Sequence, residues 1–254
     1  MSARSARSAE RHHLDGEVVP PASWIQQDLR KVAGAASAGL VAGFVVNGVG
    51  SRLAMMLLAR LNPQVTGLVS DDDFVMGQFT LGDTVSLVAF GTLVGVLGGL
   101  LYLTVRQLRF GPQWFRTASM TIGPAVVVGS MLVHTDGIDF RVLEPAWFAI
   151  SLFVALPGVF AFAVMRLTDR WTRPEAWPMR TRRAWVLGLL PLVSLGPVLL
   201  LLAAGVTFRV IHATVPRVRH LLDRPAAPVT ARLALIVVFA LALRSLIADV
   251  VTLL

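Results

Sequence analysis

The stretch GFVVNGVGSRLAMMLLARLNP, residues 43–63, contains the end of the first long apolar run of the chain and the charges that follow it. Residues 32–51 carry no charge, and Arg52 and Arg60 come next. About twenty helical residues, each rising about 1.5 Å, cross the roughly 30 Å hydrocarbon core of a bilayer. We therefore expect a membrane-spanning helix from residue 32, with Arg52 at the edge of the lipid rather than at its centre.

A helical side chain leans toward the amino terminus of its helix, so Arg52 is directed back toward the lipid. A charge in that position needs a partner. Two carboxylates follow neighbouring apolar runs, and we predict a structural ion pair between Arg52 and either Asp83 or Glu144. The apolar segment LAMMLLA after Arg52 then projects beyond the lipid, where an outer cap folded over it is expected.

The composition of the whole chain is that of a membrane protein. Of its 254 residues, 55% are hydrophobic and only 15% are charged, whereas soluble proteins are about 25% charged. The formal net charge is +8, but the basic residues cluster between apolar runs, which is typical of membrane topology and argues against nucleic-acid binding. The chain has no cysteine, which excludes disulfides and thiolate metal sites.

The apolar runs predict an all-α, polytopic transmembrane helix bundle. Residues 1–22 are polar and predict a disordered cytoplasmic tail, and residues 23–254 predict a single transmembrane domain. The expected spans lie near residues 32–60, 81–105, 117–134, 145–166, 184–208 and 229–252.

The fifth run, residues 184–208, leaves two topologies open because it contains Pro191 and Pro197. A kinked fifth span gives six spans and returns the carboxyl terminus to the cytoplasm. A re-entrant fifth segment gives five spans and leaves the carboxyl terminus outside.

Charge distribution orients the predicted bundle. The connections 106–116 and 166–183 are basic, whereas the connections 71–83 and 136–144 are acidic. Basic connections remain in the cytoplasm, so the amino terminus is expected there and the acidic connections outside. In the outer segment 66–82, apolar and threonine residues flank a run of aspartates, which predicts a short β-hairpin with Asp72 and Asp73 in its turn, within a small acidic cap. Lys31 is the single lysine among 23 basic residues, a bias that indicates a high-GC bacterium and hence a bacterial plasma membrane.

Small residues recur at four-residue spacing in the first two spans. This spacing is that of a glycine zipper and predicts an antiparallel hairpin packed stripe against stripe, through the residues Gly39, Gly43, Asn47, Gly91, Gly95 and Gly99. Asn47 lies on the stripe, where a cross-helix hydrogen bond is expected and a contact with a transported ligand is the alternative.

Candidate chemistry is sparse. His134, Asp136 and Asp139 contain donors that suit a cation, but their spacing also fits an ordinary polar turn. Arg244 and Asp249 are charges within the last apolar run, either in a transport path or on the wet face of an interfacial helix. No phosphate-binding loop or hydrolase motif is present in the sequence, and no cofactor or enzymatic activity is predicted.

Three short stretches carry a resemblance. GVGSRLAM at 48–55, GLVSDDDFVMGQFTLGDT at 67–84 and DFRVLEP at 139–145, with ALPG at 155–158, are similar to a group of polytopic membrane proteins from high-GC bacteria that has no assigned activity. The resemblance implies the hairpin and the outer segments, and it implies no activity.

Three functions fit the sequence. The first is a non-enzymatic accessory or structural subunit that assembles with a partner membrane protein or with itself, because small-residue stripes and apolar surface favour helix association. The second is a small transporter or channel that uses Asn47, Arg244 and Asp249. The third is an ion-binding sensor or membrane enzyme built on the acidic outer segments.

Overall fold

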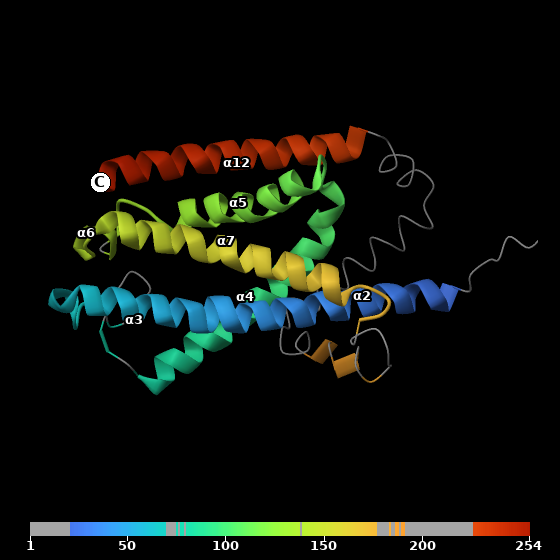
Figure 1. The fold of residues 1–254 in the computed structure, drawn as a ribbon, viewed down its shortest axis with the longest axis horizontal. Helices are drawn as coiled ribbons and strands as arrows, with labels where there is room; N and C mark the ends of the chain where they lie inside the picture. The colour runs from blue at the N-terminus through green and yellow to red at the C-terminus, as the bar shows by residue number, and fades with distance from the viewer. Residues whose placement is uncertain are drawn as a thin grey trace, which may run out of the picture.

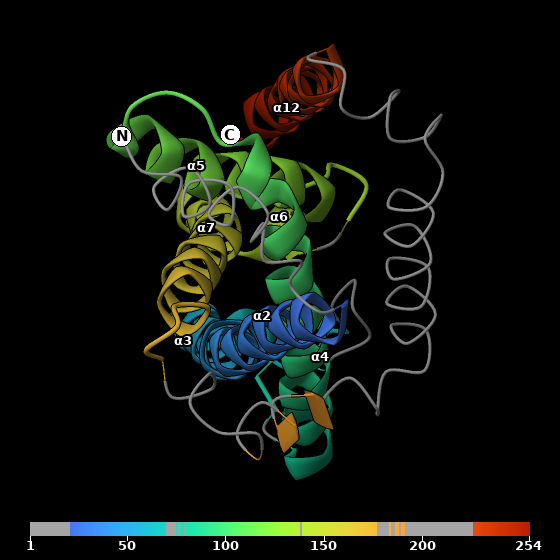
Figure 2. The same cartoon turned by 90° about the vertical axis from the view of Figure 1, so that its right-hand side faces the viewer.

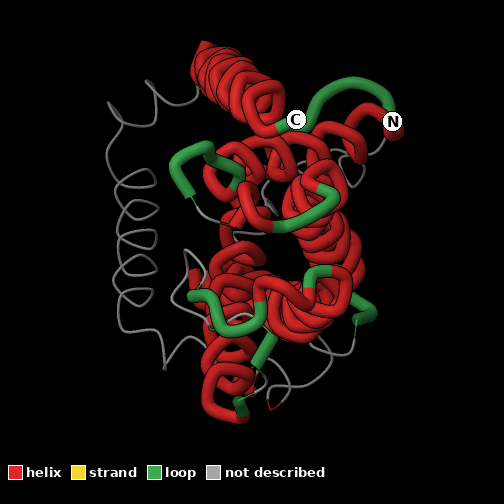
Figure 3. Tube along the Cα trace, turned by 90° about the vertical axis from the view of Figure 1, so that its left-hand side faces the viewer, coloured by secondary structure: helices red, strands yellow, loops and turns green. Residues whose placement is uncertain are grey.

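The computed structural model describes residues 21–69, 75, 77–78, 80–137, 139–176, 183, 186–187, 189–190 and 226–254. Within these residues the chain forms helices joined by turns, and Figure 3 shows no strand among them. The predicted all-α class is confirmed. In place of the expected hairpin strands there is one antiparallel bridge between Val69 and Val75, and residues 70–74 lie outside the described part.

The first helix is long and has a π-helical middle. Helix α2 (Pro21–Ala42) continues into the π-helix η1 (Gly43–Gly50) and then into α3 (Ser51–Leu61) without a break. The 3₁₀ turn η2 (Pro63–Val65) follows. Three glycines in the eight residues of η1 weaken the preference for ordinary α geometry there.

The remaining helices follow in pairs. Helix α4 (Leu81–Val105) begins with Thr80, whose hydroxyl accepts the Asp83 N–H at 3.1 Å, and it ends in the 3₁₀ turn η3 (Arg106–Leu108). Helix α5 (Gln113–Leu132) and the short α6 (Asp139–Val142) come next. The last two described long helices are α7 (Ala146–Trp171) and α12 (Ala226–Leu253).

Among the described residues, four helical segments are long and apolar enough to cross a membrane: Gln26–Leu61, Leu81–Leu108, Ala146–Trp171 and Val229–Leu253. Helix α5, which contains the predicted span 117–134, is not among them. Its 20 residues include threonines, serines, two glycines and Pro124, which lower its hydropathy. The predicted tail 1–22 and the run 184–208 lie wholly or largely outside the described residues.

The long helices stack in the order α12, α5, α7 and α2, and α4 crosses this stack obliquely (Figures 1 and 2). The largest described cluster of buried side chains joins six elements in the half of the bundle where α3 ends, and it comprises Leu58, Val65, Val126, Val133, Phe140, Leu143, Ala149, Ile150 and Leu246. Helix α4 contacts α2 and α7, but its start projects from the stack beside α3 (Figure 1).

Basic residues are concentrated at one end of the bundle. One end, which we call the basic end, contains the start of α2, the end of α4, the start of α5, the end of α7 and the start of α12 (right in Figure 1). The other, the acidic end, contains the end of α3, the start of α4, α6 and the last residue of α12. The cations at the basic end are Arg30, Lys31, Arg106, Arg109, Arg116, Arg166, Arg170, Arg173 and Arg232.

Contacts at both ends of α12 show the direction in which this helix runs through the bundle. Near its start, Arg232 donates from Nε to the Leu108 carbonyl at 3.1 Å, and its guanidinium lies 5.3 Å from the centre of the Phe110 ring. At its end, Thr252 and Leu253 lie beside Thr135, which follows α5. Six strictly alternating spans would instead start α12 at the acidic end. Residues 184–208, which decide between the two predicted topologies, lie largely outside the described residues.

Candidate functional site

The predicted stripes of small residues lie against each other with their backbones in contact. A Cβ atom on Gly95 would lie 2.3 Å from the Gly39 carbonyl oxygen and 2.5 Å from the Gly43 Cα. One on Gly99 would lie 2.2 Å from the carbonyl oxygen of Ala35. Real Cβ atoms do not approach so closely, so only glycine fits these positions. The contact order is antiparallel, with the later residues of the first helix meeting the earlier residues of α4.

Asn47 lies in η1 at the same interface. A Cβ on Gly91 would lie 2.8 Å from the Asn47 carbonyl carbon and 3.0 Å from its Cβ. The Asn47 side chain is half-buried, and its amide forms no hydrogen bond with another described residue. Gly50, at the end of η1, faces Leu156 of α7. The π-helical segment is therefore packed between α4 and α7.

Arg52 donates a hydrogen bond to backbone, and the predicted ion pair with Asp83 or Glu144 is not found among the described residues. Its Nη2 donates to the Gln78 carbonyl oxygen at 3.4 Å, so it does link the first helix to the outer segment before α4. The ion pairs within the described residues are Lys31–Asp28 at 3.7 Å and Arg109–Asp169 at 3.0 Å. The start of α4, whose first turn carries Asp83, diverges from α3 (Figure 1).

Asn62, directly after α3, holds the acidic end together and was not predicted. Its side chain is fully buried, its Oδ1 accepts the Glu144 N–H at 2.7 Å, and its Nδ2 donates to the Glu144 carbonyl at 2.9 Å. Nδ2 also donates to the Leu58 carbonyl at 3.0 Å, which caps α3. The Glu144 backbone is thereby fixed to α3. The Asn62–Pro63 pair after an apolar helix is the sequence signal that indicates such a stop.

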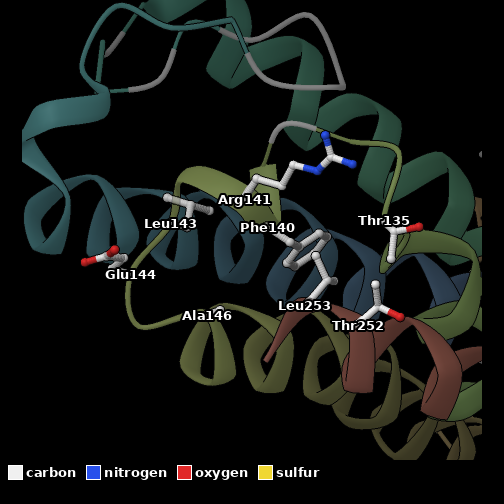
Figure 4. A pocket seen from close by; sticks show the side chains of 8 residues that line it. All are labelled: Thr135, Phe140, Arg141, Leu143, Glu144, Ala146, Thr252 and Leu253. Atoms are coloured by element: carbon white, nitrogen blue, oxygen red, sulfur yellow. The ribbon is translucent and has the colours of Figure 1, made fainter.

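A cavity of about 390 Å³ opens at the acidic end (Figure 4). Its walls come from the α5–α6 connection, α6, the start of α7 and the end of α12. Figure 4 shows the Phe140 ring and Leu253 at its centre and the hydroxyls of Thr135 and Thr252 on one side. The Arg141 guanidinium and the Glu144 carboxylate extend in different directions at the rim. The cavity combines an apolar floor with opposite charges that are held apart.

The candidate metal ligands do not converge. His134 is half-buried, Asp136 is exposed and Asp139 is buried at 8% exposure. No group of three or more His, Asp or Glu side chains suited to a metal ion occurs within the described residues. Asp139 is the first residue of α6, and its carbonyl accepts the Leu143 N–H at 3.2 Å. These residues form the turn between α5 and α7.

A polar network at the basic end joins α4, η3 and α7. Tyr102, the one tyrosine of the chain, donates its hydroxyl to Asp169 Oδ1 at 2.9 Å. Arg109 Nη1 binds the other oxygen of Asp169 at 3.0 Å, and Arg106 Nη1 donates to the Thr172 hydroxyl at 3.2 Å. This network was not predicted from the sequence, because its members lie far apart in the chain. A single tyrosine near the end of an apolar run was the available signal.

Arg244 and Asp249 lie on α12, away from Asn47. Helices α5 and α7 separate α12 from the first helix (Figure 2). Arg244 is exposed and forms no ion pair or hydrogen bond with any described residue. Asp249 is half-buried and accepts the Ser245 hydroxyl at 3.4 Å. The three polar residues proposed for a transport path are therefore not brought together.

Comparisons of the chain with protein-family models, curated proteins and solved structures found no match. The resemblance to a group of bacterial polytopic proteins stays a prediction. The described part of the chain contains four helices that are compatible with membrane embedding, polar contacts of Asn62 and of Asp169 that hold helix ends together, and the exposed Arg244 well inside an apolar helix.

Proposed function

We propose that this integral membrane protein is a non-catalytic accessory subunit that binds a partner transmembrane helix through the exposed face of α12. One observation carries the proposal, namely the placement of Arg244 on that face. The sides of α12 differ sharply. Phe239, Ala242, Leu246 and Val250 pack toward the main buried cluster. The opposite stripe is exposed and comprises Val237, Leu241, Arg244, Ala248 and Val251.

Arg244 is too deep in α12 to reach water easily. It precedes Leu253, the last residue of the apolar span, by nine residues, which is about 14 Å of helix and close to half of the roughly 30 Å hydrocarbon core. Its side chain leans toward the helix start, away from the nearer membrane surface. A lone arginine near the centre of a lipid-facing helix costs about 2.5–3.5 kcal/mol on insertion scales.

A partner helix with a carboxylate at the same depth removes this cost. Intramembrane charges pair with one another or face the interior of an assembly. The apolar stripe on both sides of Arg244 supplies the packing surface. The partner is therefore an integral membrane protein with an Asp or Glu in a span, or a second copy of this chain that contributes Asp249.

A crosslinking experiment in cells tests the proposal. A photoreactive amino acid replaces Leu241, which is 62% exposed on the α12 stripe, or Leu101, which is 63% exposed on α4 and serves as the control. We expect a discrete protein adduct from position 241, its loss in Arg244→Leu, and its partial return in Arg244→Lys. Expression and helix content of Arg244→Leu should stay at the wild-type level, because the replaced side chain is exposed and forms no hydrogen bond or ion pair with a described residue.

Two results contradict the proposal. One is the absence of a protein adduct from position 241. The other is an adduct that persists unchanged in Arg244→Leu, since the arginine would then not recruit the partner. An adduct of this chain with itself identifies a homo-oligomer, and any other mass identifies a separate subunit.

We further propose that the basic end is cytoplasmic, that the membrane is a bacterial plasma membrane, and that residue 254 lies on the outer side. Positive-inside retention supports the orientation, and the direction of α12 supports the position of residue 254. The chain contains no cysteine, so each single-cysteine variant carries one thiol at a known position. We expect a membrane-impermeant maleimide to label Asp136→Cys and Leu254→Cys on intact cells but not Gln107→Cys. If Leu254→Cys, like Gln107→Cys, is labelled only after the cells are lysed, residue 254 lies on the cytoplasmic side.

A further inference from the structure

A groove of about 690 Å³ lies between α5 and α7 at the basic end of the bundle. Its α5 wall comprises Gln113, Trp114, Thr117, Ala118, Thr121 and Ile122. Phe162 of α7 forms the other wall. Ile122 is 52% exposed and Phe162 is 42% exposed, so the groove opens on the outer surface of the bundle.

The floor of the groove is apolar in spite of its two threonines. Thr117 donates its hydroxyl to the Gln113 carbonyl at 3.1 Å, and Thr121 donates to the Thr117 carbonyl at 2.9 Å. Both hydroxyl protons are therefore used within α5, and neither needs a ligand. The groove thus suits a hydrocarbon chain along most of its length.

The helix register places arginines at one end of this groove. Gly158 of α7 faces Ala125 of α5, and Val154 faces Gly129, which fixes an antiparallel pairing. Moving back along α5 by one turn corresponds to moving forward along α7 by one turn, so Arg166 is level with Thr117. Its guanidinium carbon lies 5.8 Å from the centre of the Phe162 ring, which confirms that it stands at the mouth of the groove.

A second arginine continues this rim. Arg170 is one turn further along α7 and therefore level with Gln113, and both arginines are exposed. Between them on the chain is Asp169, whose carboxylate is bound by Arg109 and the Tyr102 hydroxyl. The rim therefore has a net positive charge.

The dimensions match one chain of a lipid in one leaflet. From Gln113 to Ile122 the helix rises about 14 Å, which is close to half of the roughly 30 Å hydrocarbon core. Trp114 is 71% exposed at the end of the groove near the arginines, and tryptophan favours the headgroup level. We propose that the groove binds one anionic phospholipid, with an acyl chain along α5 and its phosphate at Arg166 and Arg170.

The charge of the rim selects the class of lipid. Two arginines without a free carboxylate attract a phosphate and repel the ammonium group of a zwitterionic headgroup. Basic pockets between transmembrane helices bind anionic headgroups for this reason. The site lies on α5 and α7, away from the exposed face of α12, so it does not depend on the proposed accessory function.

Native mass spectrometry tests the proposal directly. The full chain is purified in detergent with equal amounts of phosphatidylglycerol and phosphatidylcholine, and the lipid adducts that survive delipidation are counted. We expect one retained phosphatidylglycerol. Arg166→Gln should lower its retention at least fivefold by removing the phosphate contact, and Ala118→Phe should do so by filling the groove without changing the charge.

Arg60→Gln is the matched control because it removes one exposed arginine at the acidic end. It should retain the lipid as the wild type does. Circular dichroism and gel filtration verify that each variant is folded, and Ala118→Leu replaces Ala118→Phe if the latter is not. Three results overturn the proposal: no preference for phosphatidylglycerol in the wild type, equal loss in Arg60→Gln and Arg166→Gln, or full retention when the groove is filled.

Discussion

Helices α4 and α12 both have apolar residues on every side, yet they pack differently. In α4, 22% of the apolar window is buried and the helix meets α2 and η1 backbone against backbone. In α12, only 6% of the window is buried and one stripe alone packs on the bundle. Helix α4 carries Gly91, Gly95 and Gly99, whereas α12 contains no glycine.

This difference shows that hydrophobicity does not decide which helix is buried in a membrane. Lipid tails are as apolar as leucine, so exchange of lipid for protein gives little free energy. Close backbone approach does give free energy, through many dispersion contacts. The stripe of glycines on α4 therefore determines which helix it packs against, and α12 has no such stripe.

The strongest test of the comparison adds a methyl group at the closest backbone contact between α2 and α4. Gly95→Ala would place its Cβ against the Gly39 carbonyl and the Gly43 Cα, both backbone atoms that cannot rotate away. Overpacking costs about 1–3 kcal/mol when neighbouring side chains can move aside. Here the neighbours are backbone atoms, so we expect a loss of about 3 kcal/mol or more in the free energy of unfolding. Thermal unfolding in detergent measures it.

Gly123→Ala is the control for that substitution. A Cβ on Gly123 of α5 would meet no atom within 4 Å, so this variant should be as stable as the wild type or slightly more stable. Equal stability of both alanine variants would contradict the backbone-contact explanation of the α2–α4 pair.

The second test removes the polar clamp at the acidic end. Asn62→Ala leaves the Glu144 N–H and carbonyl without their buried partners, and we expect a loss of about 2 kcal/mol in the free energy of unfolding. Gln64→Ala, which removes only a donor to Asn62 Oδ1, should cost less than half as much. Similar losses in the two variants would show that the clamp is not specific to Asn62.

The third test addresses the network at the basic end. Asp169→Ala removes the acceptor of both Tyr102 and Arg109, and about 1 kcal/mol of stability should be lost because the pair is partly open to solvent. Asp169→Asn keeps one acceptor oxygen and should lie between this variant and the wild type. Urea-induced unfolding in micelles measures the stabilities of the wild type and the two variants. An unchanged unfolding midpoint for Asp169→Ala would exclude a structural role for the network.

The smallest effect is expected on the exposed side of α12. Leu241→Ala and Ile236→Ala change side chains that are 62% and 52% exposed, so the stability of the isolated chain should change by about 0.5 kcal/mol or less. Leu246→Ala, on the buried stripe, should cost about 2 kcal/mol in the same melting assay. A large loss for Leu241→Ala would mean that α12 is packed on both sides.

Much of the fold could be predicted from apolar runs and spacing. The helices at 81–105 and 146–171 start and end close to where the charges and prolines place them. Four-residue spacing identified Gly39, Gly43, Gly91 and Gly95 as contact residues, and these lie against each other. Such features are local, because one helix turn fixes which residues share a face.

The candidate sites were predicted less well. The pairing of Arg52 depended on the direction of α4, which runs obliquely. The clamp of Asn62 and the network of Tyr102 join residues that are 82 and 67 positions apart. No spacing rule relates such positions, since they meet only after the helices have packed.

The amino-acid sequence by itself determined the class of this protein, because the cost of unpaired backbone groups in lipid permits long apolar runs only as helices. It also determined the face on which α4 is packed, since glycine spacing is a property of one helix. The tertiary structure alone decided the direction of α12 and the isolation of Arg244 on its outer face. Both depend on which helices lie side by side. When two helices have the same hydropathy, their composition does not indicate which other helix each will pack against.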